Sequence, residues 1–234
     1  MKDYIKVNEL RCHIGFSGYF NFDIAYWRKS DRLILCDINP TQVIFMKQTI
    51  KSIKENKNRQ LFKDDMIHYS KMKDKEFVIE MTNKSYHKNY KHHGMIYSPN
   101  ISTDESYKNL NEFTNESIFI SQLNYELNRK GSWLYDDNGY DYIRHLAIND
   151  LIAIFCEDII AFPSQKIKKL LLDNHIVVDT IYTSNIYDFI RHYNAYNTFI
   201  QLLCAPKTLV IESELRVGLC QTVVTGDKLL SYIN

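Results

Sequence analysis

The 234-residue sequence predicts a doubly wound α/β fold, in which helices cover both faces of a mostly parallel sheet. The first observation is that short apolar runs alternate with segments of helical periodicity, both before residue 54 and after residue 131. The second is that several of these runs end on acidic or polar residues, which is typical of the carboxyl edge of an open parallel sheet. Strands that alternate with helices imply right-handed crossovers between parallel strands.

The first four elements form a strand–helix–strand–helix unit. Residues 11–15 are the first strand, and the chain then turns at Gly15–Gly18. A helix is expected over residues 20–28, with three large residues on its apolar face: Phe20, Ile24 and Trp27. Residues 32–36 (Arg-Leu-Ile-Leu-Cys) are the second strand. Thr41 is suited to be the N-cap of the next helix, which continues to Ile53.

Residues 56–130 are expected to be a helical and loop insertion within a single domain that spans residues 1–234. Charged residues dominate this segment, and helical patterns occur only over 64–72 and 116–127. Residues 84–109 mix Tyr, His, Lys, Asn and Ser. A long loop of this kind in a compact domain is usually functional or disordered. We expect the insertion to lie over the carboxyl edge of the sheet.

Regular alternation returns after Gly131. The expected helices are 137–148, 165–172, 186–193 and 196–203, and the expected strands are 151–156, 176–182, 208–211 and 217–224. Trp133 precedes the first of these helices, and we expect it to be buried as a core anchor rather than presented to a substrate.

Composition excludes several classes of protein. The 29 basic and 28 acidic residues leave no global field that would recruit nucleic acid or acidic lipid. The five cysteines are scattered without CxxC or Cys/His ligand spacing, so neither a disulfide framework nor a metal site is expected. No apolar signal-peptide core or membrane-spanning run occurs, which predicts a cytoplasmic protein without membrane contact. Motifs of hydrolases, kinases and metalloproteases do not occur.

Asp37 is the leading candidate for ligand binding. It follows an apolar strand and precedes Asn-Pro-Thr and a helix, which places its carboxylate at the carboxyl edge of the sheet. An acidic residue there typically binds the ribose hydroxyls of a nucleotide-type cofactor. About twenty residues upstream, the turn Gly15–Gly18 could bring backbone close to the same ligand. The alternative is that Asp37 only caps the turn before the following helix.

Four segments in this order resemble the S-adenosylmethionine-dependent methyltransferase superfamily, whose sheet is Rossmann-like. They are Ile14-Gly15-Phe16-Ser17-Gly18, Asp37-Ile38-Asn39-Pro40, Glu157-Asp158 and Thr183-Ser184-Asn185. The glycine motif departs from the family pattern. His13 occupies the usual acidic position, Ser17 replaces the second glycine and Tyr19 the third, while Gly18 compensates by one register.

The resemblance implies S-adenosylmethionine as cofactor and a transferase of unidentified acceptor, methyl transfer being favoured. It implies cofactor contacts from six residues: Gly15, Ser17, Gly18, Asp37, Ile38 and Asp158. Asp37 would bind the ribose and Asp158 the adenine. Ser184 and Asn185 would line the reaction site. The segment from Tyr182 to Asp188 also resembles the Ser-Asn turn of enzymes that transfer the aminocarboxypropyl group, so the reaction type stays open.

Several of these residues have structural alternatives. Asp158 could be a surface carboxylate or an N-cap, and Asn185 is well suited to cap the helix that follows it. His13 could orient a ligand or act as a base, but a buried histidine with satisfied hydrogen bonds is favoured.

The basic and aromatic segment 84–93 could contact RNA. A second function therefore stays open, in which the chain is a non-catalytic methyltransferase-like module that binds RNA or protein through the insertion.

Overall fold

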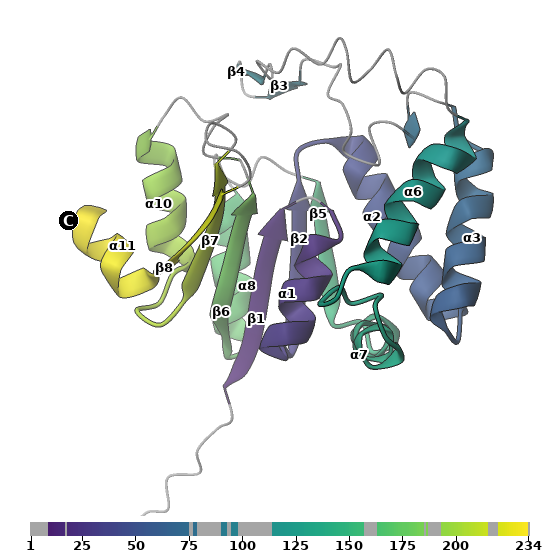
Figure 1. Ribbon diagram of the computed structural model, residues 1–234. Coiled ribbons are helices and arrows are strands. Elements are labelled where there is room, and N and C mark those ends of the chain that lie inside the picture. The colour runs from purple at the N-terminus through teal and green to yellow at the C-terminus, as the bar shows by residue number, and fades with distance from the viewer. Residues whose placement is uncertain are drawn as a thin grey trace, which may run out of the picture.

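The computed structural model describes residues 9–16, 18–74, 77–78, 90–92, 95–97, 114–156, 163–184, 186, 193–214 and 220–233. Its centre is a six-stranded sheet of order β5-β2-β1-β6-β7-β8 (Figure 1). The strands of this sheet are β1 (Leu10–Phe16), β2 (Arg32–Asp37), β5 (Ile152–Cys156), β6 (Ile176–Ser184), β7 (Leu209–Glu214) and β8 (Cys220–Thr225). Strands β3 (Tyr90–His92) and β4 (Met95–Tyr97) form a separate antiparallel hairpin.

The predicted fold class is confirmed. Every neighbouring pair in the six-stranded sheet is parallel except β7 and β8, which are antiparallel. From β1 the chain adds β2 and then β5 on one side, and later adds β6, β7 and β8 on the other. The strand order therefore reverses between β1 and β6, which is the topological switch point of a doubly wound sheet.

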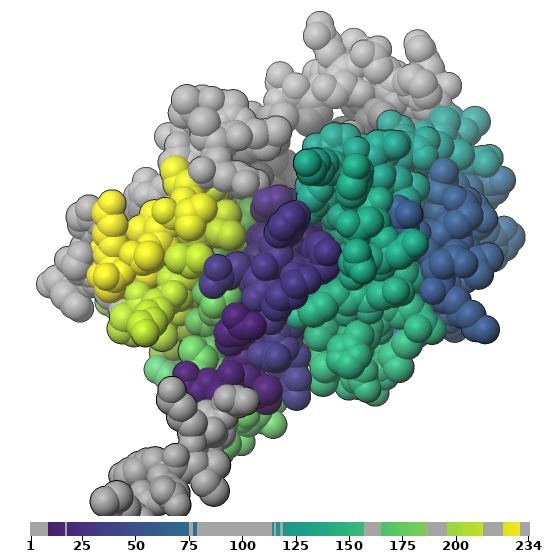
Figure 2. All heavy atoms as spheres, turned by 60° about the horizontal axis from the view of Figure 1, so that its bottom comes forward, coloured from purple at the N-terminus to yellow at the C-terminus, as the bar shows by residue number. Residues whose placement is uncertain are grey.

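Helices cover both faces of the sheet. They are α1 (Phe20–Arg28), α2 (Pro40–Glu55), α3 (Arg59–Lys71), α6 (Asn115–Asn128), α7 (Asp137–Ile148), α8 (Pro163–Asp173), α10 (Tyr193–Leu203) and α11 (Gly226–Ile233). One core joins β2 to α1, α2, α3, α6 and α7, and the other joins β1, β6 and β7 to α8 and α10. In Figure 2 the purple atoms of β1 and α1 separate the teal α6–α7 region from the yellow C-terminal elements.

Strand β1 contributes to both faces, as the two-residue period of a strand requires. Cys12, Ile14 and Phe16 belong to the core with α8 and α10. The intervening residues His13 and Gly15 face Asn21, on helix α1. The polar side chain of His13 is therefore buried under α1, directly beside the switch point.

Helix α1 has the predicted bounds, but its buried face differs from the expected one. Its buried residues run from Asn21 to Ala25 and include two polar side chains, Asn21 and Asp23. Trp27, which we expected on the apolar face, is 64% exposed, and its indole N–H donates to the carbonyl oxygen of Gly131 at 2.7 Å. Hydrogen-bond partners far away in the sequence decide this face, so apolar periodicity alone misplaces it.

Helix α2 begins two residues earlier than predicted. Asn39 is its N-cap and accepts a hydrogen bond from the backbone N–H of Thr41, while Pro40 occupies the first helical position. The prediction of Thr41 as N-cap is therefore wrong, because Asn39 and a proline at the first position make a stronger start signal. In the part of the chain that the structure describes, no helix is long and apolar enough to cross a membrane.

Candidate functional site

The carboxyl ends of the parallel strands converge at the switch point. Gly15 on β1 pairs with Tyr182 on β6, and Phe16 pairs with Cys36 on β2. Asp37, one residue further on, pairs with Cys156 on β5. Adjacent strands lie about 4.8 Å apart, so Asp37 and the end of β6 are separated by two strand spacings, about 10 Å. Open α/β sheets bind their ligands in the crevice at this point.

The two positions of the predicted cofactor turn that are glycine require glycine for different structural reasons. Gly18 has φ +52°, in the left-handed region that favours glycine, and a Cβ there would meet no atom within 4 Å. A Cβ on Gly15 would lie 1.7 Å from Oδ1 of Asn21. Gly15 therefore makes room for a side chain of α1, whereas Gly18 shapes the turn itself. Ser17 lies outside the described residues.

Asp37 is half-buried at the end of β2. Its Oδ1 accepts the backbone N–H of Asn39 at 2.8 Å, so Asp37 does form the turn before α2. In the described part of the chain no cation pairs with its carboxylate. Burial raises the pKa of Asp37 to about 7, although backbone N–H groups of Asn39 and Ile38 favour the ionised form. Ile38 is half-buried in the same turn.

Ser184 ends β6 with φ +54°, an uncommon conformation for a residue with a side chain. The register between β6 and β7 shifts between Tyr182 and Ser184, so Ser184 pairs with Glu212. A bulge and a left-handed residue at the end of a central strand are typical of positions where the chain is shaped for a ligand. Asn185 and Asp158 lie outside the described residues.

Beside Ser184 the structure places a polar pair that the sequence did not predict. The hydroxyl of Tyr196, on α10, donates to Oε1 of Glu212 on β7. Burial raises the pKa of the Tyr196 phenol, and the neighbouring Glu212 raises it further. The phenol therefore stays protonated and acts as a donor at neutral pH. The pairing of β6 with β7 places Glu212 beside Ser184.

His13 is a buried histidine with satisfied hydrogen bonds, the alternative that the sequence favoured. Its Nδ1 lies 2.7 Å from Oγ1 of Thr180, and its Nε2 lies 3.2 Å from Oδ1 of Asn21. Burial lowers the pKa of His13 to about 4, so the ring is neutral at physiological pH.

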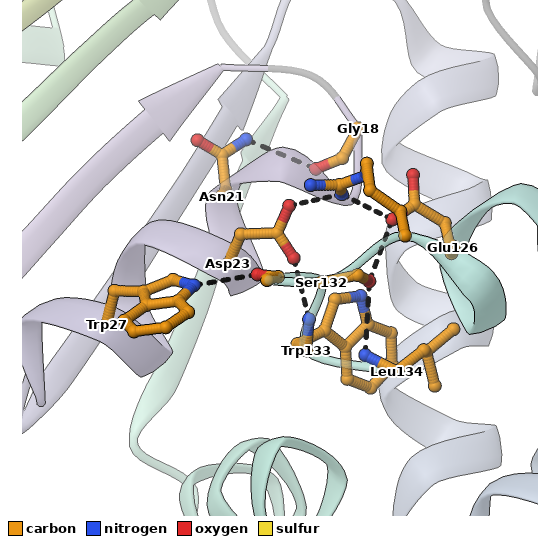
Figure 3. Close-up of polar contacts among 10 residues, drawn as sticks. Gly18, Asn21, Asp23, Trp27, Glu126, Ser132, Trp133 and Leu134 are labelled. Atoms are coloured by element: carbon orange, nitrogen blue, oxygen red, sulfur yellow. Dashed lines mark hydrogen bonds and ion pairs between the residues drawn. The ribbon is translucent and has the colours of Figure 1, made fainter. Parts of the chain in front are cut away.

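A charged network lies on the side of α1 that faces away from His13 (Figure 3). Oδ2 of Asp23 is 2.5 Å from Nη2 of Arg129, which also contacts Oε2 of Glu126 at 2.5 Å. Oδ1 of Asp23 accepts the backbone N–H of Trp133, and Ser132 donates to Glu126. Trp133 is fully buried, as predicted. This network joins α1 to the end of α6 and to the loop that follows.

The segment 84–93, which could contact RNA, lies outside the described residues except for the backbone of 90–92. Across the described ranges, no group of three His, Cys, Asp or Glu side chains could hold a metal ion.

Comparisons with known proteins were made for sequence and for structure. A family model described as "Domain of unknown function (DUF7790)" matches residues 1–232. A search of curated protein sequences finds no match. Two solved structures of the rRNA methyltransferase AviRa from Streptomyces viridochromogenes are similar to 94% and 93% of this chain, and to 78% of their own chains. Identity is 7% and 8%, and both TM-scores are 0.35.

Proposed function

This chain belongs to the family described as "Domain of unknown function (DUF7790)", and we propose that it binds S-adenosylmethionine and transfers a group from it. The cofactor would bind at the carboxyl edge of the sheet, at the switch point between β1 and β6. Methyl transfer to an acceptor is the favoured reaction, and aminocarboxypropyl transfer is the alternative.

The observation that carries this proposal is the carboxylate of Asp37. It is half-buried beside the switch point, and within the described residues it has no cationic partner. A carboxylate in such a place costs folding free energy, because burial disfavours its charged form. Perturbed carboxyl groups of this kind cluster at functional sites. The two hydroxyls of a ribose would supply the hydrogen bonds that the fold does not.

The surrounding residues fit a nucleoside cofactor. The left-handed Gly18 leaves open space where a side chain would otherwise stand, so backbone can approach a ligand. The N–H of Asn39 holds one oxygen of Asp37 and thereby orients the carboxylate. Asp158 would contact the adenine, and Ser184 and Asn185 would line the acceptor side. The cofactor supplies a carbon activated by a sulfonium, and these residues contribute by positioning, which can supply much of the rate.

Calorimetric titration with S-adenosylhomocysteine tests the proposal. Asp37→Asn keeps the oxygen that accepts from Asn39 but removes the charge, and should weaken binding about tenfold to a hundredfold. Asp150→Asn is the matched control, because Asp150 is exposed, precedes β5 and therefore lies at the opposite edge of the sheet. The control should bind like the wild type.

A cofactor analogue sharpens the assignment of Asp37 to the ribose. 2′-Deoxy-S-adenosylhomocysteine should bind the wild type more weakly than the parent compound does. Asp37→Asn should lose little further affinity for it, because the hydroxyl and the carboxylate act as one pair. If removal of the 2′-hydroxyl costs the wild type and Asp37→Asn the same affinity, Asp37 does not bind the ribose.

Stability is a second, independent measurement on the same residue. Asp37→Asn should raise the free energy of unfolding at pH 8 by on the order of 1 kcal/mol, since it removes a half-buried charge that has no cationic partner within the described residues. Urea unfolding at pH 8 measures this. A folded wild type that binds neither S-adenosylmethionine nor S-adenosylhomocysteine would contradict the proposal, and a non-catalytic module that binds RNA or protein would then be the better hypothesis.

A further inference from the structure

The side-chain amide of Asn21, on α1, donates hydrogen bonds to the backbone of the glycine turn that follows β1. Its Nδ2 lies 3.1 Å from the carbonyl oxygen of Phe16 and 3.3 Å from that of Gly18 (Figure 3 shows the contact with Gly18). Phe16 is the last residue of β1, and Gly18 is the left-handed residue of the turn. One amide group therefore donates to two carbonyls that flank the turn.

The orientation of this amide is determined by its surroundings. If nitrogen and oxygen were exchanged, Oδ1 would face two carbonyl oxygens, and neither could donate to it. With Nδ2 on the turn, Oδ1 faces Nε2 of His13 at 3.2 Å. An amide oxygen only accepts, so Nε2 must carry the proton of the imidazole. Nδ1 is then the acceptor, and the hydroxyl of Thr180 donates to it.

The network consists of neutral groups. His13, Asn21 and Thr180 are all fully buried, and the two side-chain contacts of the imidazole each join one donor to one acceptor. Gly15 completes it by absence of a side chain, because a Cβ there would collide with both Asn21 and Nε2 of His13. The residues come from β1, α1 and β6, which are the elements on both sides of the switch point.

We propose that Asn21 is a positioning residue that sets the shape of the glycine turn for the cofactor, and that His13 and Thr180 hold its amide in the required orientation. The effect of Asn21 on cofactor binding rests on the proposed function. The turn geometry itself does not depend on any ligand. A neutral hydrogen-bonded chain thus shapes the turn in a sequence that carries a histidine at the start of its glycine motif.

The test compares Asn21→Ala with Asn56→Ala. Both variants lose an amide that donates to a backbone carbonyl, because Nδ2 of Asn56 donates to the carbonyl oxygen of Ser52 at 2.9 Å. Asn56 caps the C-terminus of α2, away from the carboxyl edge of the sheet. Hydrogen–deuterium exchange over residues 14–24, without ligand, reports the turn. Titration with S-adenosylhomocysteine reports the consequence.

Asn21→Ala should speed exchange in the turn and weaken S-adenosylhomocysteine binding about tenfold or more, since one buried and one partly buried carbonyl lose this donor. Asn56→Ala should change neither. Unchanged exchange and affinity in a folded Asn21→Ala would overturn the inference. If the wild type does not bind the ligand, the proposed function fails, and the exchange data still decide the role of Asn21.

Two further measurements test the proposal even if Asn21→Ala does not fold. The nitrogen chemical shifts of His13 in the wild type should show a proton on Nε2 and none on Nδ1, unchanged from pH 8 to pH 5. Thr180→Val, nearly isosteric, should weaken S-adenosylhomocysteine binding by a few-fold, because Nδ1 loses its donor and the ring its anchor. A proton on Nδ1, or full affinity in Thr180→Val, would contradict the proposed orientation.

Discussion

Helix α1 is held by two buried polar networks of opposite character. On the side facing the sheet, Asn21 joins His13 and Thr180 through hydrogen bonds between neutral groups. On the other side, Asp23 joins Arg129 and, through it, a second carboxylate on α6. Positions two apart on a helix differ by about 200° in direction. One nine-residue helix therefore presents polar side chains to two different surroundings.

The two networks have different roles: the neutral one positions the glycine turn, and the charged one attaches α6 and the loop after it to α1. The neutral network ends on the backbone of the glycine turn, and its groups need no charge to bind one another. The charged network ends on the loop that returns from α6, and it buries two carboxylates against one guanidinium. Burial raises the pKa of Asp23 to about 6 despite Arg129. The attachment of α6 therefore depends on an ion pair and on the charge of Asp23, whereas the turn depends on hydrogen bonds between neutral groups.

The largest expected effect breaks the charged network. Arg129→Met would leave Asp23 and Glu126 buried without their cation, which should cost about 3–5 kcal/mol of folding free energy. The side chains of Asp23 and Glu126 are only 4% and 6% exposed, so water cannot replace the guanidinium. Urea unfolding at pH 7.5 measures the loss.

Lys54→Met is the control for this change, because Lys54 pairs with Asp150, which is 82% exposed. Loss of such a surface pair should cost less than about 1 kcal/mol. Equal costs in the two variants would mean that Arg129 is not a buried partner in solution.

A smaller effect breaks the neutral network. Gly15→Ala would place a Cβ on Asn21 and should destabilise the fold by about 2–3 kcal/mol, because the amide must leave its position. Gly18→Ala meets no atom, and should cost only about 1 kcal/mol for its left-handed backbone. Thermal unfolding of both variants gives the order. A larger cost at Gly18 would show that Asn21 can move aside.

The smallest expected effect is the net dependence of stability on pH, because the two networks oppose each other. The folded-state pKa of Asp23 is about 6 against an ordinary 3.8, so the folded state binds its proton more tightly. Stability from this group falls as pH rises from about 4 to 6. The pKa of His13 is about 4 against an ordinary 6.5, so its contribution is present above pH 6.5 and is lost as pH falls toward 4.

Urea unfolding between pH 4.5 and 8 separates the two contributions. His13→Gln should remove the loss toward acid and leave stability rising as pH falls. Asp23→Asn should remove the slope of Asp23, so that the loss toward acid from His13 is opposed only by Asp37. The carboxyl of Asp37, whose pKa is about 7, adds to the slope of Asp23 up to that pH. A His13→Gln variant with the wild-type profile would show that the ring is not held neutral.

Local signals predicted most of the regular structure. The bounds of α1 and α7 agree with the expected ranges to the residue, since turn residues and caps lie at both ends of each. Helix α11 was not predicted from the sequence. Asp37 and Gly18 were predicted at the carboxyl edge of the sheet because each follows directly on an apolar strand.

The sequence by itself determined the doubly wound class, the order of its elements and the edge at which the candidate site lies, because these depend on periodicity and on residues next to one another. Only the tertiary structure decided which polar residues are buried. Thr180 lies 167 residues after His13, and Trp133 lies 110 residues after Asp23. From the sequence alone, a polar side chain on a helix is expected to face solvent. Here the hydrogen-bond partners lie on strands and loops that only folding brings together.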